Sequence, residues 1–292
     1  MSDFYCDKLV VIGVGLIGGS VSAALRRAGK VRRIVGVGRS RANIERALEL
    51  RVIDEAIEDL AVAVKGADIV LLAVPVQQND RVLAQLAASV PAATLVTDAG
   101  STKGNFVTTV RRLLPSHLPH VIPAHPIAGA ELTGVDAANP GLFIDKNVVL
   151  TPLPENDAGA IDRIESMWQA CGAHVSRMSC DHHDQVFSAV SHLPHMLAYT
   201  LVHMIATRTD ARELFNFAAG GFRDFTRIAS SSPEMWRDIA CSNREALLAD
   251  IASFQQQLAQ LAGLIRNADV EQLGQIFETA RNARNAWLQQ DS

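Results

Sequence analysis

The chain has 292 residues, of which 48% are hydrophobic and 20% charged, which suits one large or two medium domains with a substantial core. A net charge of -4 at pH 7 gives no electrostatic reason to expect binding to nucleic acid or to an anionic membrane. The N-terminus lacks the basic start and apolar run of a signal peptide, and no segment is apolar for long enough to span a bilayer. We therefore expect a cytoplasmic protein. The cysteines are widely spaced and indicate reduced thiols rather than disulfides or a zinc site: Cys6, Cys171, Cys180 and Cys241.

The first half of the chain alternates between strand-like and helix-like segments. Near-continuous runs of Val, Ile and Leu, typical of parallel strands covered on both faces, lie at 8–13, 32–37, 68–74 and 94–98. Segments with helical spacing lie at 16–29, 43–50, 80–88 and 104–114. This alternation predicts a doubly wound α/β domain. We expect further runs at 120–124, 147–152 and 173–178 to extend the same sheet, with a helix at 160–171.

Beyond residue 178 the pattern is helical. One helix should begin with Ser232 as its N-cap and Pro233 in its first position. Its apolar residues recur at three- and four-residue steps as far as Ile265, which gives about 33 residues and roughly 50 Å. A second helix should begin at the capping-box pattern Asp269-x-x-Gln272. Helices of this length cannot bury both faces on one small domain, so we expect a homodimer, with a monomeric bundle as the alternative.

The first predicted strand is followed by Gly13-Val14-Gly15-Leu16-Ile17-Gly18, a G-x-G-x-x-G pattern that opens a predicted helix. In a dinucleotide-binding domain these glycines serve a tight turn, the close approach of a pyrophosphate and the packing of helix on strand. The N-terminus of the helix offers its free N–H groups to the phosphates. We interpret these six residues as a cofactor loop, with an ordinary tight turn as the alternative.

The end of the second predicted strand bears on the choice of cofactor. Domains that prefer NAD usually carry Asp or Glu there, and this chain has Gly38, followed by Arg39 and Ser40. An arginine and a hydroxyl suit the 2′-phosphate of NADP, so we predict NADP. The alternative is that Arg39 is a solvated loop residue.

Ligands of open α/β sheets bind beyond the carboxyl ends of the strands. Val74 and Pro75 should form a backbone shelf beside the cofactor, and Ser101 is either a helix N-cap or a contact to a substrate hydroxyl. His125 follows another strand in an almost apolar loop. An imidazole with an ordinary pKa near 6.5 is suited to accept the proton of an alcohol that loses hydride.

The helical half carries further candidates. His192 and His195 are three residues apart, with His182 and His183 nearby. No cysteine or carboxylate has convincing ligand spacing, so we predict no metal site. Arg223 and Arg227 are four residues apart beside Gly220-Gly221, an arrangement that suits recognition of a carboxylate.

Five motifs in this order resemble one family: GVGLIGGS at 13–20, DAGSTKG at 98–104, HPIAGAELTGV at 125–135, SHLPH at 191–195 and GGFRDFTRIA…SPEMWRDI at 220–239. The sequence resembles the prephenate/arogenate (cyclohexadienyl) dehydrogenases of tyrosine biosynthesis over nearly its whole length. The resemblance implies oxidative decarboxylation of a cyclohexadienol: hydride passes to the nicotinamide, CO2 is lost and the ring becomes aromatic. It also implies a Rossmann domain, here 1–177, and a helical substrate-binding and dimerisation domain, here 178–292.

The resemblance also carries roles over to single residues. His125 matches the catalytic histidine, Ser101 the serine that orients the substrate hydroxyl and nicotinamide, and Arg227 the arginine that holds a substrate carboxylate. Residues that line or gate the substrate pocket are matched by His195, Glu131, Gly220 and Trp236.

One departure from the family concerns the cofactor. Many relatives carry an aspartate where Gly38 stands, so NADP remains the prediction over NAD. The chain ends after its helical region, so we expect no regulation by an appended domain, while tyrosine stays a candidate competitive inhibitor. The choice between prephenate and arogenate stays open.

Two other functions are weighed against this one. A β-hydroxyacid dehydrogenase or imine reductase has a similar layout but would need a base such as lysine in the helical half, and Lys146 is the last lysine. A non-catalytic NADP-sensing module is the other alternative.

Overall fold

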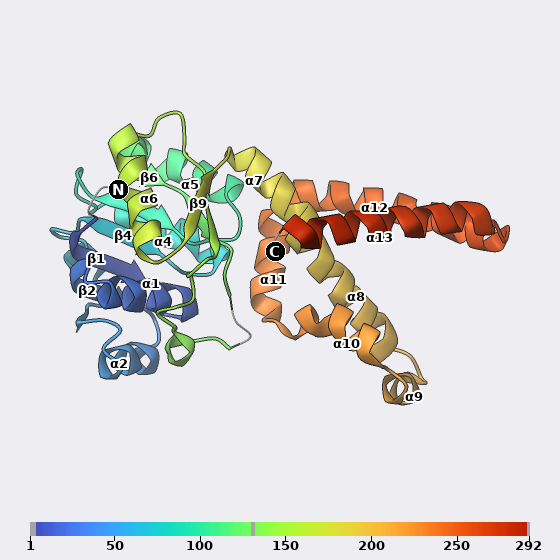
Figure 1. Cartoon of the computed structure of the whole chain (residues 1–292). Helices are drawn as coiled ribbons and strands as arrows, with labels where there is room; N and C mark the ends of the chain where they lie inside the picture. Colours follow the sequence, from blue (N-terminus) through green and yellow to red (C-terminus); the bar gives the residue numbers. More distant parts are fainter. Residues whose placement is uncertain (1–3, 130–131, 291–292) are drawn as a thin grey trace. The chain divides into compact units, whose positions relative to one another are not determined.

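The computed structural model describes residues 4–129 and 132–290. The chain divides into two compact units, residues 1–244 and 245–292. The first unit contains both sheets and the helices up to α11, and the second contains nearly all of α12 and all of α13 (Figure 1).

The main sheet has the architecture that the sequence predicts. Its strands are β1 (Cys6–Ile12), β2 (Val31–Val37), β3 (Glu55–Ala56), β4 (Ile69–Leu72), β5 (Leu95–Asp98) and β6 (Val121–Ile122). They are all parallel, in the order β3-β2-β1-β4-β5-β6. The connecting helices are α1 (Leu16–Arg27), α2 (Arg41–Glu49), α3 (Leu60–Ala63), α4 (Asn79–Ala87) and α5 (Gly104–Leu113). The doubly wound fold is confirmed; β3 and α3 are too short to carry a readable pattern.

A separate three-stranded sheet corrects one expectation. It consists of β7 (Ala124–Pro126), β8 (Asn147–Leu150) and β9 (His174–Arg177), with β7 antiparallel to β8. The run at 120–124 does extend the main sheet through β6, which pairs with β5, but the prediction is wrong for 147–152 and 173–178. The apolar run at 120–124 is divided at Pro123, which has no N–H to continue a ladder, and its carbonyl accepts a hydrogen bond from the N–H of Thr151 at 2.9 Å.

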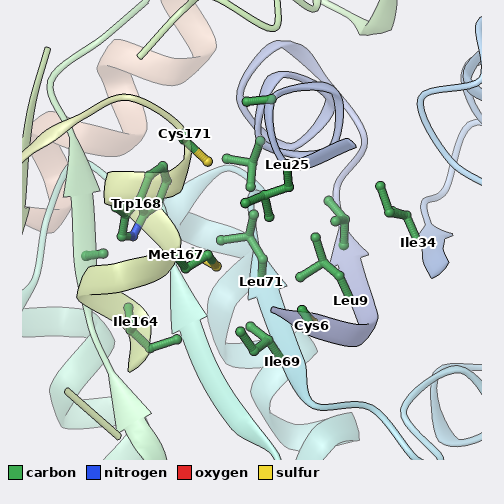
Figure 2. Packing of buried hydrophobic residues seen from close by; sticks show 14 of the residues in the cluster. Cys6, Leu9, Leu25, Ile34, Ile69, Leu71, Ile164, Met167, Trp168 and Cys171 are labelled. Carbon is green, nitrogen blue, oxygen red and sulfur yellow. The ribbon is translucent and has the colours of Figure 1, made fainter. Parts of the chain in front are cut away.

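The apolar core covers both faces of the main sheet. Along β1, Leu9 and Val11 pack in one cluster and Val10 and Ile12 in another. Figure 2 shows the first cluster, in which α6 (Ala158–Ala170) contributes Trp168. Burial on both faces explains why these strands are continuously apolar rather than alternating.

The remainder of the first unit is helical, as predicted. It contains α7 (Cys180–Phe187), a π-helical turn (Ser188–His192), α8 (Leu193–Ala206), α9 (Ala211–Asn216), α10 (Gly220–Thr226), a 3-10 turn (Arg227–Ser230) and α11 (Pro233–Ser242). None of the helices in the described ranges is long and apolar enough to cross a membrane.

The long helix expected from Ser232 to Ile265 is two helices. Ser232 caps α11 as predicted, its Oγ accepting from the N–H of Met235 at 3.3 Å. The helix is then interrupted at Asn243, and α12 (Arg244–Arg266) begins directly after it. The side-chain amide of Asn243 donates to the carbonyl of Asp184 at 2.7 Å, so a contact from a distant part of the chain accompanies the break.

The second unit is built from α12 and α13. The expected cap of α13 (Val270–Gln290) is present, since Asp269 Oδ1 accepts from the N–H of Gln272 at 3.0 Å. Both helices carry exposed large apolar side chains, among them Leu258, Ile265, Phe277 and Trp287.

Candidate active site

The loop between β1 and α1 has a geometry that only small residues permit. Gly13 has a φ of +96°, and a Cβ there would lie 2.5 Å from the carbonyl oxygen of Ala73. A Cβ at Gly18 would lie 2.8 Å from Cγ1 of Val11, so α1 packs closely on β1. Next to Gly15, by contrast, a Cβ would meet nothing within 4 Å. The loop thus combines a tight turn, close packing and open space where a pyrophosphate would approach.

This open space belongs to a cavity of about 560 Å³. Six of the residues predicted to bind the cofactor line it together: Gly13, Gly15, Arg39, Ser40, Val74 and Pro75. Leu16, Ile17 and Gly18 lie in the first turn of α1 and are not among the lining residues. The N-cap of α1, Gly15, forms no side-chain cap, which leaves N–H groups at this end of the helix for a phosphate. These features fit a dinucleotide.

The sequence reasoning missed other residues of this cavity: Asn43, Glu58, Gln78, Arg81 and Gln85. Asn43 holds the glycine loop, since its Nδ2 donates to the carbonyl of Val14 at 2.6 Å. Arg81 lies in the first turn of α4, the helix that follows the Val74-Pro75 shelf. Its position at the start of that helix is the signal that could have identified it.

The end of β2 has little room for a carboxylate. A Cβ at Gly38 would lie 2.9 Å from Cδ1 of Ile44, so an aspartate at this position would need Ile44 to move. Arg39 is exposed. The Oγ of Ser40 accepts from the N–H of Asn43 at 3.3 Å as the cap of α2, and its own O–H remains able to donate to a phosphate.

A buried ion pair joins the end of β5 to β7. Lys103 Nζ lies 2.5 Å from Asp98 Oδ2, and both side chains are buried. Nζ also donates to the carbonyl of Ala124 at 2.7 Å, and Asp98 Oδ1 accepts from the Ala124 N–H at 3.0 Å. The residue before His125 is therefore held through both of its backbone polar groups.

Ser101 is not a helix cap. The first helical residue of α5 is Gly104, and the N–H groups of Lys103 and Gly104 donate to the carboxylate of Asp184 at 2.9 and 2.8 Å. The N-cap interpretation of Ser101 is thus wrong, because a side chain from α7 caps this helix. The half-buried Ser101 side chain makes no hydrogen bond to another described residue, so its hydroxyl stays available for a ligand.

His125 is held through one ring nitrogen. Its Nδ1 lies 2.9 Å from Nε2 of His183, and the ring of Phe187 packs edge-on at 4.8 Å between centroids. Burial above all lowers the pKa of His125 well below its ordinary value, and the positive charge of Lys103 acts in the same direction. The imidazole is therefore neutral at physiological pH, the state that accepts a proton.

A second group of predicted residues meets between α8 and α11. The rings of His195 and Trp236 stack at 3.4 Å between centroids and 18°. His195 Nδ1 donates to the carbonyl of Ser191 at 2.8 Å. Burial lowers the pKa of His195, and the positive charge of Arg227 acts in the same direction. Trp236 Nε1 is buried without a hydrogen-bond partner among the described residues.

His192 ends the π-helical turn that precedes α8. It is buried, and its ring is 6.1 Å from that of Trp236 between centroids. Asn243 Nδ2 lies 3.0 Å from its Nδ1. Burial above all lowers the pKa of His192 to about 4. Because Asn243 Nδ2 also donates to the carbonyl of Asp184 at 2.7 Å, His192 and Asn243 connect α7 to the His195–Trp236 stack.

Gly220 and Glu131 are the remaining residues predicted for the substrate pocket. Gly220 begins α10, and a Cβ there would meet nothing within 4 Å. Glu131 lies outside the described residues. Within residues 4–129 and 132–290 there is no group of three His, Cys, Asp or Glu side chains that could hold a metal ion.

Comparison with known proteins decides the family. Residues 21–177 match the family model described as "Prephenate dehydrogenase, nucleotide-binding domain", and residues 179–279 match "Prephenate dehydrogenase, dimerization domain". The chain belongs to the prephenate dehydrogenase family. It is therefore an oxidoreductase of tyrosine biosynthesis that uses a nicotinamide cofactor.

Individual members of the prephenate dehydrogenase family are similar over most of their length. The prephenate dehydrogenase of Bacillus subtilis (strain 168) is 37% identical over 96% of this chain and 76% of its own length. The cyclohexadienyl dehydrogenase of Zymomonas mobilis is 35% identical over 95% of both chains. The crystal structure of the A. aeolicus prephenate dehydrogenase with hydroxyphenyl propionate and NAD+ aligns with this chain at a TM-score of 0.89. The two sequences are 34% identical, and the alignment covers 95% of this chain and 97% of that one.

Proposed function

We propose that the protein catalyses the NADP-dependent oxidative decarboxylation of prephenate, arogenate or both, giving 4-hydroxyphenylpyruvate or tyrosine. The observation that carries this proposal is His125, a buried neutral imidazole held through Nδ1. Its Nε2 makes no hydrogen bond to another described residue and is left for the substrate. Family membership supports the same reaction.

The residues divide the chemistry among them. When bound, the nicotinamide takes up the hydride from the carbinol carbon of the ring. His125 accepts the hydroxyl proton as that hydride leaves, and the same proton is available to the phenolate oxygen after CO2 is lost. The Ser101 hydroxyl orients the substrate hydroxyl, and Arg227 binds a carboxylate.

The remaining pocket residues shape the site around the ring. His195 and Trp236 present stacked faces, and Gly220 leaves space for the substrate to approach the backbone. Glu131 is proposed as a pocket or gate residue from the sequence alone. Tyrosine is the product expected from arogenate and shares the phenol ring and a carboxylate with 4-hydroxyphenylpyruvate, which supports direct competition at this site.

The choice of NADP rests on the surroundings of the adenosine ribose. No carboxylate stands at Gly38, and Arg39, Ser40 and Arg81 line the cavity. Glu58 also lines it and is an acceptor that could bind a ribose hydroxyl. The A. aeolicus structure contains NAD+, so the cofactor needs a direct test.

That test compares the two cofactors in the wild-type protein and in Arg39→Ala. We expect kcat/KM of the wild type to be higher with NADP than with NAD. In the variant, kcat/KM with NADP should fall at least about tenfold because an arginine–phosphate pair is removed, and kcat/KM with NAD should stay unchanged. Arg41→Ala is the matched control, because Arg41 pairs with Glu45 on the same helix and is not among the lining residues. A wild-type preference for NAD would overturn the choice.

We also propose that residues 178–292 bind the substrate and form a homodimer. The exposed apolar side chains of α12 and α13 and the match to a dimerization domain support this proposal. Sedimentation velocity should show one species of twice the mass of the 31.5 kDa chain.

A further inference from the structure

Three side chains, one from β7 and two consecutive ones from α7, form a line of hydrogen bonds that ends at His125. His125 Nδ1 lies 2.9 Å from His183 Nε2, and His183 Nδ1 lies 2.8 Å from Asp184 Oδ1. The His183 side chain is fully buried, and that of Asp184 is 13% exposed. The line therefore lies inside the protein, where an unmatched donor or acceptor costs free energy.

The carboxylate of Asp184 fixes the direction of the line. Burial by itself would raise the pKa of Asp184, but hydrogen bonds from His183, Gly104 and Lys103 lower it. The carboxylate is thus ionised and only accepts. Its two oxygens accept from two backbone N–H groups. Because the carboxylate has no proton to donate, Nδ1 of His183 must carry the hydrogen of the bond between them.

The position of the proton on His183 determines the position of the proton on His125. Burial is the largest cause of the lowered pKa of His183, so this ring is neutral and carries one proton, on Nδ1. Its Nε2 then accepts, and His125 must donate from Nδ1. A neutral His125 with its proton on Nδ1 has a bare Nε2, the form that can remove a proton.

We propose that His183 and Asp184 are positioning residues that hold His125 in the Nδ1–H tautomer, with Nε2 facing the substrate. The inference rests on the proposed role of His125. An ionised carboxylate that sets the tautomer of a basic histidine has a known effect elsewhere, where its loss costs on the order of 10⁴ in kcat.

Two variants test the direction of the line. In Asp184→Asn the amide can donate to His183, which would reverse both bonds and leave a proton on Nε2 of His125. In His183→Leu the acceptor for His125 is lost, whereas His183→Gln retains an amide oxygen within reach. We expect kcat to fall roughly 10²–10⁴-fold in Asp184→Asn and His183→Leu, with partial recovery in His183→Gln and little change in cofactor KM.

Matched controls come from the same helix. His182 and Asp181 are exposed, and His182→Gln and Asp181→Asn should keep wild-type kcat. Because Asp184 also caps α5, thermal melting should confirm that each variant is folded. Equal kcat in wild type, Asp184→Asn and His183→Leu would overturn the proposal.

A spectroscopic measurement does not require turnover. Protein with ¹⁵N-labelled histidine should show His125 protonated on Nδ1 in long-range ¹H–¹⁵N correlation, with the assignment made by loss of the signal in His125→Asn. Finding the proton on Nε2 would overturn the inference, whatever the activity. If the protein oxidises neither substrate but His125 carries Nδ1–H, the proposed function fails and the positioning line stands.

Discussion

At the scale of single residues, the proposed catalysis depends on a buried, neutral imidazole. His125 can receive a proton because burial and nearby charges disfavour its own protonation. The same environment makes the side chain hard to replace, since an amide in this position could hydrogen-bond to the substrate but could not remove its proton.

His125→Asn should lower kcat roughly 10²–10⁴-fold, the usual range for general acid–base groups, and leave NADP affinity near that of the wild type. Isothermal titration would measure the affinity and steady-state rates the turnover. His182→Asn, an exposed neighbour of the buried His183, serves as the control. Turnover near the wild-type rate would remove His125 from the mechanism.

The lowered pKa of His125 also predicts the acid side of the pH profile. A base whose pKa lies well below the ordinary 6.5 stays mostly deprotonated at a pH where a free imidazole is half protonated, so the acid fall of kcat/KM should have its midpoint below pH 6.5. A midpoint at or above pH 6.5 for the acid limb would contradict this account.

At the scale of elements, the buried Asp98–Lys103 pair connects the loop after β5 to the strand that carries His125. Removing one partner of a buried pair leaves the other charge uncompensated. Lys103→Met should therefore lower the free energy of unfolding by about 3–5 kcal/mol, and Lys103→Met with Asp98→Asn should cost less than the sum of the two single changes. Urea unfolding measures these values.

An exposed ion pair provides the comparison. Arg111 and Glu155 lie 3.1 Å apart at the surface, and Arg111→Met should cost less than about 1 kcal/mol. Additive effects at Asp98 and Lys103 would show that the buried pair is not coupled.

The elements also show what a sequence can and cannot predict. The longer parallel strands can be predicted because each is apolar on both faces, and the glycine loop because it lies between strand and helix. The second sheet and the break at Asn243 depend on partners far along the chain, Thr151 and Asp184, which no local pattern reveals. The same holds for His183 and Asp184, whose spacing from His125 carries no periodic signal.

At the scale of the whole molecule, several histidines have pKa values below their ordinary 6.5, mainly because of burial: His117, His125, His183, His192 and His195. Below pH 6.5 the unfolded chain takes up protons that the folded protein does not, so the free energy of unfolding falls with the pH. We expect a loss of at least about 1 kcal/mol between pH 7.5 and 5.5 by urea unfolding. An unchanged midpoint over this range would show that these histidines are protonated in the folded state.

The central claim is that the protein oxidises and decarboxylates a cyclohexadienol with NADP. The most direct measurement is formation of the reduced cofactor by the purified protein, followed by the near-ultraviolet absorbance of the reduced nicotinamide, with prephenate and arogenate each tested with NADP and NAD. The account predicts absorbance that rises only when one of these substrates is present, is faster with NADP than with NAD, and is accompanied by release of CO2. No reduced cofactor with either substrate would contradict it.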